Sequence, residues 1–237
     1  MARLPDLPRS HDHFERLSAS FLGVFLLVLS VLIASALVDE DRFGRTTVIG
    51  LFLLTVVVSF RAAHIRQSAR RMVIALGVLG GVVAIVVEFL FPGNADIVVL
   101  VVCVLLVVAS QAAILIYLVR LPVVNRETVM GALCIYLLEG IYFGLVYGIV
   151  DALTAGPFFQ QVDTATSFER LYFSFVTITT VGYGDFSAVP NIGRALAATE
   201  ALIGQFYLVV VVAQVIAKMG STKKWAQPID DDGAAGD

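Results

Sequence analysis

The sequence predicts an all-α membrane protein with six transmembrane helices and a re-entrant helix and loop between the last two. Of its 237 residues, 59% are hydrophobic and 15% are charged, whereas a soluble domain has about a quarter charged residues. Several segments have the roughly 20 apolar residues that a helix needs to cross a bilayer. A further segment, 151–190, contains a short apolar run but is too polar and too interrupted to cross.

Six segments qualify as spans: 17–38, 46–60, 72–91, 97–119, 128–150 and 195–217. The first and fourth are uncharged, whereas the third, fifth and sixth each contain one glutamate, namely Glu88, Glu139 and Glu200. The second span is short. We expect it to continue through Arg61 and His64, with both side chains snorkelling to the interface.

The first span has to be distinguished from a secretory signal peptide, because Ala34-Ser35-Ala36 is similar to a cleavage site. Its 22 uncharged residues exceed the about 7 to 15 of a signal h-region. Acidic residues such as Asp12 and Glu15 also precede it, where a signal peptide is basic. We therefore expect a retained transmembrane helix.

The placement of Lys and Arg predicts the orientation of the chain. With the N-terminus inside, twelve of the 16 Lys and Arg residues lie on the inner side, as the positive-inside rule requires. We expect a multi-pass protein of the cell membrane with cytoplasmic tails at 1–16 and 220–237. Segment 151–190 then faces outward. Because 18 residues follow Met219, we expect no ligand-sensing soluble domain after the last span.

A helix start is encoded at Thr166-Ser167-Phe168-Glu169, which has capping-box spacing. Apolar residues continue to Ile178, so we predict a short helix over 167–179, about long enough for half a crossing. Non-helical backbone is tolerated at membrane depth where protein or a watery cavity borders it. A short helix followed directly by a glycine-rich loop fits this exception. The C-terminal end of such a helix is partially negative and favours a cation.

The run Thr180-Val181-Gly182-Tyr183-Gly184, followed by Asp185, is the most informative segment of the chain. Four copies of such a loop supply rings of backbone carbonyls that replace the hydration shell of a potassium ion. Gly182 and Gly184 permit backbone dihedrals that other residues avoid. One loop per chain supplies a quarter of each ring, so we expect a homotetramer.

Over about 128–217 the chain resembles the pore-loop potassium channels, and the run 177–185 carries the most specific part of the resemblance. This resemblance implies a pore domain at 122–219, with an outer helix at 128–150, a pore helix at 167–179, a filter at 180–184 and an inner helix at 191–219. Its implied potassium ligands are the Thr180 hydroxyl and the carbonyls of Thr180, Val181, Gly182 and Tyr183.

The resemblance also implies roles for the residues around the filter. Asp185 is expected at the outer mouth, Tyr172 and Thr179 are expected to support the filter, and the Tyr183 ring is expected to brace it against the pore helix. Two positions depart from the common pattern. Tyr172 and Phe173 stand where many members have paired tryptophans, and Val176 stands where some have a carboxylate. Tyr172 can still donate to Asp185, but we expect less polar bracing and easier inactivation of the filter.

The predicted inner helix contains the candidates for the cavity and the gate. Gly204 lies twenty residues after Gly184, where the family often has a hinge glycine. A small residue there also permits close helix packing, and the sequence leaves both interpretations open. Gln205, Leu208 and Val212 share one helical face and are candidates to line the cavity.

The first four spans, within 17–121, form a predicted four-helix peripheral domain. Segment 97–119 contains no Lys or Arg, and Arg120 lies at its inner end. Moving one charge across the membrane is worth about 2.3 kcal/mol per 100 mV, so steep voltage gating requires several such charges. We therefore expect a channel that is not strongly voltage-gated.

Ionisable residues inside spans are functional candidates. Glu88 lies three residues before Phe91, which favours an interfacial side chain. Glu139 lies near the middle of its span, where it is either protonated or paired with a polar group such as Gln111, and it is a candidate pH sensor. We expect Glu200 to hydrogen-bond behind the pore helix rather than to face ions.

We expect K⁺ as the permeant ion, no organic cofactor and no nucleic-acid partner. An enzyme is not expected, because the polar residues inside the spans form no nucleophile and base set. A basic inner loop is a candidate to contact anionic lipid headgroups, through Arg61, Arg66, Arg70 and Arg71. The alternatives are a weakly voltage- or pH-dependent channel, a potassium-transporter pore subunit and a membrane assembly protein.

Overall fold

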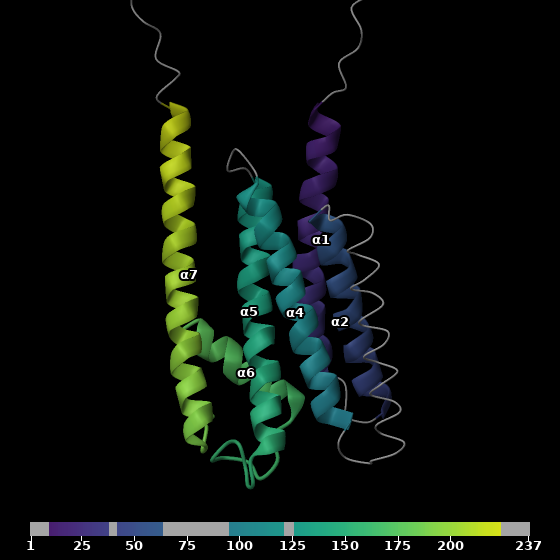
Figure 1. The fold of residues 1–237 in the computed structure, drawn as a ribbon, viewed down its shortest axis with the longest axis vertical. Coiled ribbons are helices and arrows are strands. Elements are labelled where there is room, and N and C mark those ends of the chain that lie inside the picture. Colours follow the sequence, from purple (N-terminus) through teal and green to yellow (C-terminus); the bar gives the residue numbers. More distant parts are fainter. Residues whose placement is uncertain (1–9, 38–41, 64–94, 121–125, 224–237) are drawn as a thin grey trace, which may run out of the picture.

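The computed structural model describes residues 10–37, 42–63, 95–120 and 126–223, and this part of the chain is helical with connecting loops (Figure 1). Its helices are α1 (Ser10–Leu37), α2 (Arg42–Ala62), α4 (Ala95–Val119), α5 (Arg126–Leu153), α6 (Ser167–Ile178) and α7 (Asn191–Lys223). The all-α prediction is confirmed for these residues. Outside them lie most of both tails, the predicted span 72–91 with Glu88, and the residues Arg66, Arg70 and Arg71.

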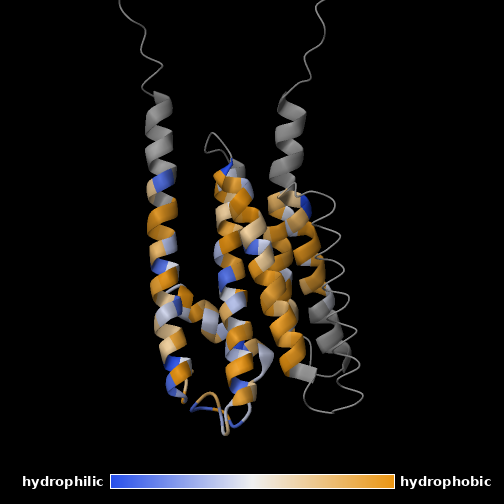
Figure 2. Ribbon diagram, in the orientation of Figure 1, coloured by the Kyte–Doolittle hydropathy of each residue, from blue (hydrophilic) through white to orange (hydrophobic). Residues whose placement is uncertain are grey.

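Three of the described helices are long and apolar enough to cross a membrane, over Ile97–Val119, Thr128–Leu153 and Asn191–Val211. Phe21–Leu37 in α1 and Gly50–Ala62 in α2 are apolar but shorter. In the coloured part of Figure 2, hydrophobic residues predominate along these helices, and hydrophilic residues interrupt α5 and α7 at intervals. This distribution is that of a helical membrane protein.

Helices α1, α2, α4 and α5 pack around one apolar core, which includes Phe21, Phe52, Val107, Ile114 and Leu138. Buried hydroxyls in this core bond within their own helices. Ser59 donates to the Thr55 carbonyl at 2.7 Å, and Ser110 donates to the Leu106 carbonyl at 2.9 Å. These bonds satisfy polar groups that have no access to water.

Helix α6 lies between α5 and α7 and contacts both (Figure 1). The close approach of α6 to α5 depends on glycines that recur every fourth residue along one face of α5. A Cβ atom on Gly140 would lie 2.8 Å from the Phe175 ring, and one on Gly144 would lie 3.2 Å from the Leu171 Cα. Small residues at such intervals let membrane helices approach closely. The glycine face therefore sets the position of α6.

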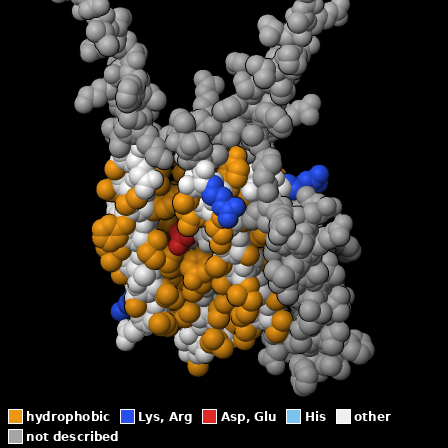
Figure 3. Space-filling model, turned by 45° about the horizontal axis from the view of Figure 1, so that its top comes forward, with side chains coloured by type: hydrophobic (Ala, Val, Ile, Leu, Met, Phe, Trp, Pro, Cys, Tyr) orange, Lys and Arg blue, Asp and Glu red, His pale blue; other side chains and the backbone are white. Residues whose placement is uncertain are grey.

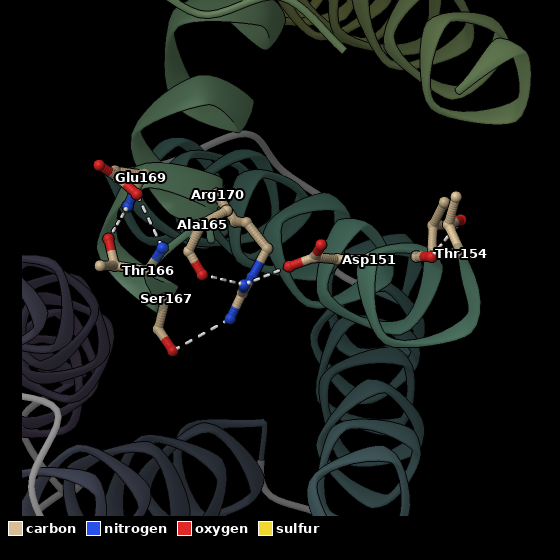
Figure 4. Close-up of polar contacts among 8 residues, drawn as sticks. Asp151, Thr154, Ala165, Thr166, Ser167, Glu169 and Arg170 are labelled. Atoms are coloured by element: carbon tan, nitrogen blue, oxygen red, sulfur yellow. Dashed lines mark hydrogen bonds and ion pairs between the residues drawn. The ribbon is translucent and has the colours of Figure 1, made fainter. Parts of the chain in front are cut away.

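The N-terminal end of α6 is held by a capping box, as the sequence predicts (Figure 4). The Glu169 N–H donates to the Thr166 Oγ1 at 3.1 Å, and the Thr166 N–H donates to the Glu169 Oε2 at 2.7 Å. Arg170 adds an ion pair with Asp151 of α5 and a bond to the Ala165 carbonyl. These contacts fix the start of α6 against the end of α5.

The segments on either side of α6 meet in an isolated antiparallel bridge between Phe159 and Ala188. The Gln160 N–H donates to the Ser187 carbonyl at 3.0 Å, and the Val189 N–H donates to the Phe158 carbonyl at 2.8 Å. Phe158 and Phe159 are fully buried in a second apolar cluster with Phe143 and Tyr147. These hydrogen bonds thus join the segment that follows α6 to the segment that precedes it.

We predict that Thr166→Ala lowers the free energy of unfolding by about 1 kcal/mol, because an N3 amide loses its side-chain acceptor. Thermal unfolding of the purified protein measures the loss. Thr154→Ala is the matched control, since the Thr154 hydroxyl, just after the end of α5, bonds to the Val150 carbonyl of that helix and its removal should cost less than about 0.5 kcal/mol. Equal stabilities of the two variants would contradict a specific role of the cap.

Candidate functional site

The loop after α6 turns its first amide groups back toward that helix. The Thr180 N–H donates to the Thr177 carbonyl at 2.9 Å, and the N–H groups of Val181 and Gly182 both donate to the Val176 carbonyl, at 3.1 and 3.2 Å. In a trans peptide the N–H and the preceding C=O point in opposite directions, and the described chain has no cis peptide. The carbonyls of residues 179–181 therefore point away from α6.

The sign of φ alternates along this loop. It is positive at Thr180 (60°), Gly182 (56°) and Gly184 (78°), but not at Val181 or Tyr183. Alternation between the two helical hands brings successive N–H groups to one side of the chain. Here the Val176 carbonyl accepts two of them. The carbonyls are left on the opposite side, where a row of oxygens can coordinate a cation.

Thr180 is the residue at which the loop departs from what the glycines predict. A positive φ is a genuine outlier for a β-branched residue, and such backbone costs on the order of 1–3 kcal/mol. The sequence predicts special dihedrals at Gly182 and Gly184 only, because threonine gives no signal for the left-handed region. Strain of this kind collects at functional sites, so its position here makes the loop a candidate functional site.

Tyr172 of α6 reaches the segment that follows the loop. Its hydroxyl donates to the Asp185 Oδ2 at 2.7 Å, which is the bond expected from the sequence. This bond to the carboxyl raises the pKa of Tyr172. The Thr179 hydroxyl, in contrast, donates to the Phe175 carbonyl of α6 at 2.6 Å. Phe173 packs edge-on against Tyr147 and Phe159, so that position contributes apolar packing alone.

The side chains of the loop are largely uncovered by their own chain. Tyr183 is 71% exposed and Val181 is 52% exposed. Contact with α6 of the same chain therefore covers little of the Tyr183 ring, and the bracing that the family resemblance implies is not made within one chain.

The C-terminal end of α6 is held by two contacts to the Ile178 carbonyl. Tyr136 of α5 donates to this oxygen at 3.0 Å. A Cβ atom on Gly204 of α7 would lie 2.8 Å from the same oxygen and 2.6 Å from the Ile178 Cγ1. Of the two interpretations that the sequence leaves open for Gly204, these distances support close packing. Gly204 lets α7 touch Ile178, the last residue of α6.

The two membrane glutamates of the described chain have different surroundings. Glu139 is half-buried, and its Oε2 accepts from the Gln111 Nε2 of α4 at 2.6 Å. Glu200 is completely buried and makes contacts with the hydroxyls of Tyr147 and Ser174. Both partnerships agree with the sequence-based expectations, Gln111 for Glu139 and a site behind the short helix for Glu200.

The remaining predicted residues lie on α7 and α2. Gln205 is exposed, Leu208 is half-buried, and Val212 belongs to α7 although its side chain lies outside the described set. Arg61 is exposed in the last turn of α2. The glycine face of α5 was not among the sequence-based predictions, although its Gly-xxx-Gly spacing at 140, 144 and 148 is readable in the sequence. That spacing is the sequence signal for the face of α5 on which α6 packs.

The comparison with protein families agrees with this geometry. Residues 129–221, which comprise most of α5, α6, the loop and most of α7, match a family model described as an ion channel. No curated protein matches the chain. Together with the apolar helices, the family match supports an ion channel domain in a membrane protein, rather than an enzyme.

We predict that Gly204→Ala lowers both stability and ion flux. The added methyl overlaps the Ile178 carbonyl, and overpacking costs about 1–3 kcal/mol, more than the roughly 1 kcal/mol that alanine gains over glycine in a helix. Thermal unfolding and flux from liposomes measure the two effects.

Gly50→Ala is the control for this substitution, because a Cβ atom there meets no atom within 4 Å. It should gain stability and leave flux unchanged. A Gly204→Ala protein that matches Gly50→Ala in both measurements would remove the packing interpretation.

Proposed function

We propose that the chain forms a homotetrameric, potassium-selective channel that conducts K⁺ passively. The observation that carries this proposal is the direction of the loop backbone. The N–H groups of residues 180–182 bond to the C-terminal end of α6, φ alternates in sign from Thr180 to Gly184, and the carbonyls are left free on the other side. Rings of such carbonyls replace the hydration shell of K⁺.

Four copies of the loop are needed to complete the proposed site. In each ring one chain supplies one oxygen, from the carbonyl of Thr180, Val181, Gly182 or Tyr183 or from the Thr180 hydroxyl. Gly184 continues the alternation of φ, and Asp185, held by Tyr172, follows at the outer mouth. A K⁺ ion is the cargo of this arrangement, and the proposal requires no organic cofactor.

Exposed apolar surface supports the tetramer. Large hydrophobic side chains of α7 are exposed in the single chain, namely Leu202, Ile203, Phe206, Val209 and Val210. Hydrophobic side chains cover most of the described surface in the view of Figure 3. Within the proposed tetramer, neighbouring chains and lipid share this surface. Val181 and the Tyr183 ring, which their own chain leaves exposed, then gain a neighbour.

The proposal includes the cell membrane as location and cytoplasmic termini. The first turn of α1 and the last turn of α7 lie at the same end of the molecule (Figure 1), as two termini on one side of the membrane require. Arg61 is exposed at the end of α2, and we propose that it contacts anionic lipid headgroups together with Arg66, Arg70 and Arg71.

Recording from purified full-length protein in planar bilayers tests the proposal. Large unitary currents that reverse near the K⁺ equilibrium potential, from a tetramer by mass measurement, are the expected result. Slow saturable K⁺ flux without unitary currents would indicate a transporter subunit instead. Absence of any flux would indicate an assembly protein.

We predict that Gly182→Ala abolishes selectivity for K⁺ over Na⁺ while the protein remains folded. No atom lies within 4 Å of a Cβ built on Gly182, but its φ of +56° is strained for alanine, by about 1–2 kcal/mol. Reversal potentials in mixed K⁺ and Na⁺ measure the selectivity.

Gly156→Ala provides the matched control, because Gly156 has φ +110° and equal free space but lies outside the loop. It should lose stability and keep its selectivity. Loss of selectivity in both variants, or in neither, would count against the assignment of the loop as the filter.

We predict a conductance that depends weakly on voltage. Helix α4 has no Lys or Arg over Ile97–Val119, so the effective gating charge should stay below about one elementary charge per channel. Conductance–voltage curves in symmetric KCl measure it. A gating charge of several units would require charged segments that move elsewhere in the chain.

A further inference from the structure

Glu200 occupies a fully buried position where three helices meet. Its side chain on α7 contacts the Tyr147 hydroxyl of α5 through Oε2 and the Ser174 hydroxyl of α6 through Oε1. The Ser174 Oγ also lies 2.6 Å from the Gly140 carbonyl of α5. Glu200, Tyr147 and Ser174 are all 0% exposed, so bulk solvent does not reach these side chains.

A count of hydrogens fixes the protonation of this cluster. Three oxygen–oxygen contacts join the four groups, and each hydrogen bond requires one hydrogen. The hydroxyls of Tyr147 and Ser174 supply one each, and the Gly140 carbonyl supplies none. With Ser174 donating to Gly140 and Tyr147 donating to Oε2, the remaining contact is satisfied only if Oε1 carries a proton and donates to Ser174. With a carboxylate, the one hydrogen of Ser174 would have to serve either Glu200 or Gly140, and the other contact would have no hydrogen.

Among the residues that the structure describes, no cation compensates a charge at this position. Glu200 forms no ion pair among the described residues. The groups that interact with it electrostatically are Tyr147, Tyr136 and Glu139, all on α5, and α6 presents the neutral Ser174. On α7 itself, Arg194 is directed to the Ala188 carbonyl. A buried carboxylate without a cation is strongly disfavoured, and Glu139 would add repulsion.

The cluster contains the first of two successive contacts between α7 and α6, Glu200 with Ser174 and Gly204 with Ile178. We call this row of contacts the seam, and it ends next to the filter. Glu200 and Gly204 are four residues apart on α7, and their partners Ser174 and Ile178 are four residues apart on α6, so each pair lies on one helical face. The first contact of the seam is a hydrogen bond, and the second is close packing against the Ile178 carbonyl. Ile178 is followed by Thr179 and then by the filter.

We propose that Glu200 carries a proton at neutral pH and, as a neutral donor to Ser174, positions α6 and the filter against the inner helix. The protonated form completes the seam. As pH rises and the proton leaves, the single Ser174 hydrogen can serve only Glu200 or Gly140, so one contact of the seam is lost. The seam then opens and K⁺ conduction falls. The role in conduction rests on the proposed function, whereas the protonation does not.

Infrared spectroscopy of the full-length protein in liposomes tests the protonation independently of transport. The difference spectrum between wild type and Glu200→Gln should contain the carbonyl band of a protonated carboxyl at pH 7. That band should persist in Glu139→Gln and vanish as the pH of the wild type is raised. Absence of the band at pH 7, or its loss in Glu139→Gln alone, would overturn the proposal.

K⁺ flux from liposomes tests the positioning role. Wild-type flux should fall over the pH range in which the infrared band is lost, and Glu200→Gln, which keeps a neutral donor, should retain wild-type flux at pH 7 without that fall. Ser174→Ala, which deprives the carboxyl of its acceptor, should lower flux at pH 7 by about tenfold. Ser110→Ala is the control, because Ser110 is equally buried but bonds within α4.

Two flux results would overturn the positioning role: the same alkaline fall in Glu200→Gln as in wild type, or wild-type flux that is unchanged while the band disappears. Equal flux in Ser174→Ala and Ser110→Ala would contradict it as well. A wild type without K⁺ flux at any pH would refute the proposed function, and the infrared spectra would still decide the protonation of Glu200.

Discussion

The opposed directions of N–H and C=O in a trans peptide are the constraint on which the rest of the structure depends. Carbonyls can be presented to one side of a loop only if the amides find acceptors on the other side, because unsatisfied groups are costly at membrane depth. The Val176 carbonyl accepts two of those amides and the Thr177 carbonyl accepts a third. The loop therefore takes its shape from the C-terminal end of α6, and the remaining contacts serve to hold that end in place.

Helix α5 is the element that holds α6 in this position relative to the rest of the chain. It packs on α1 and α4 on one side and on α6 and α7 on the other. Near the N-terminal end of α6 it contributes Asp151 to the ion pair with Arg170, and near the other end it contributes Tyr136 to the Ile178 carbonyl. One helix thus contacts both ends of α6. Its buried Tyr147 joins the aromatic cluster around Phe158 and Phe159 to the carboxyl of Glu200.

Local features of the site were predictable from the sequence, and long-range ones were not. The capping box at Thr166 depends on residues three apart, and the bond from Tyr172 to Asp185 is one that the family resemblance allows. The left-handed backbone of Thr180 could not be predicted, because it results from the amide acceptors on α6 rather than from threonine itself. Likewise, the exposure of Tyr183 depends on packing that one chain leaves incomplete.

The glycine face of α5 has a consequence for sequence variation. Most packed positions can be replaced in two directions, by a smaller side chain that leaves a cavity or by a larger one that crowds its neighbours. At Gly140 and Gly144 only the second direction exists, since glycine has no smaller replacement, and even a methyl group meets α6 at 2.8 to 3.2 Å. Room for a gain at Gly140 can therefore come from trimming Phe175, whose side chain it meets, whereas Gly144 also meets the Leu171 backbone, which no substitution trims.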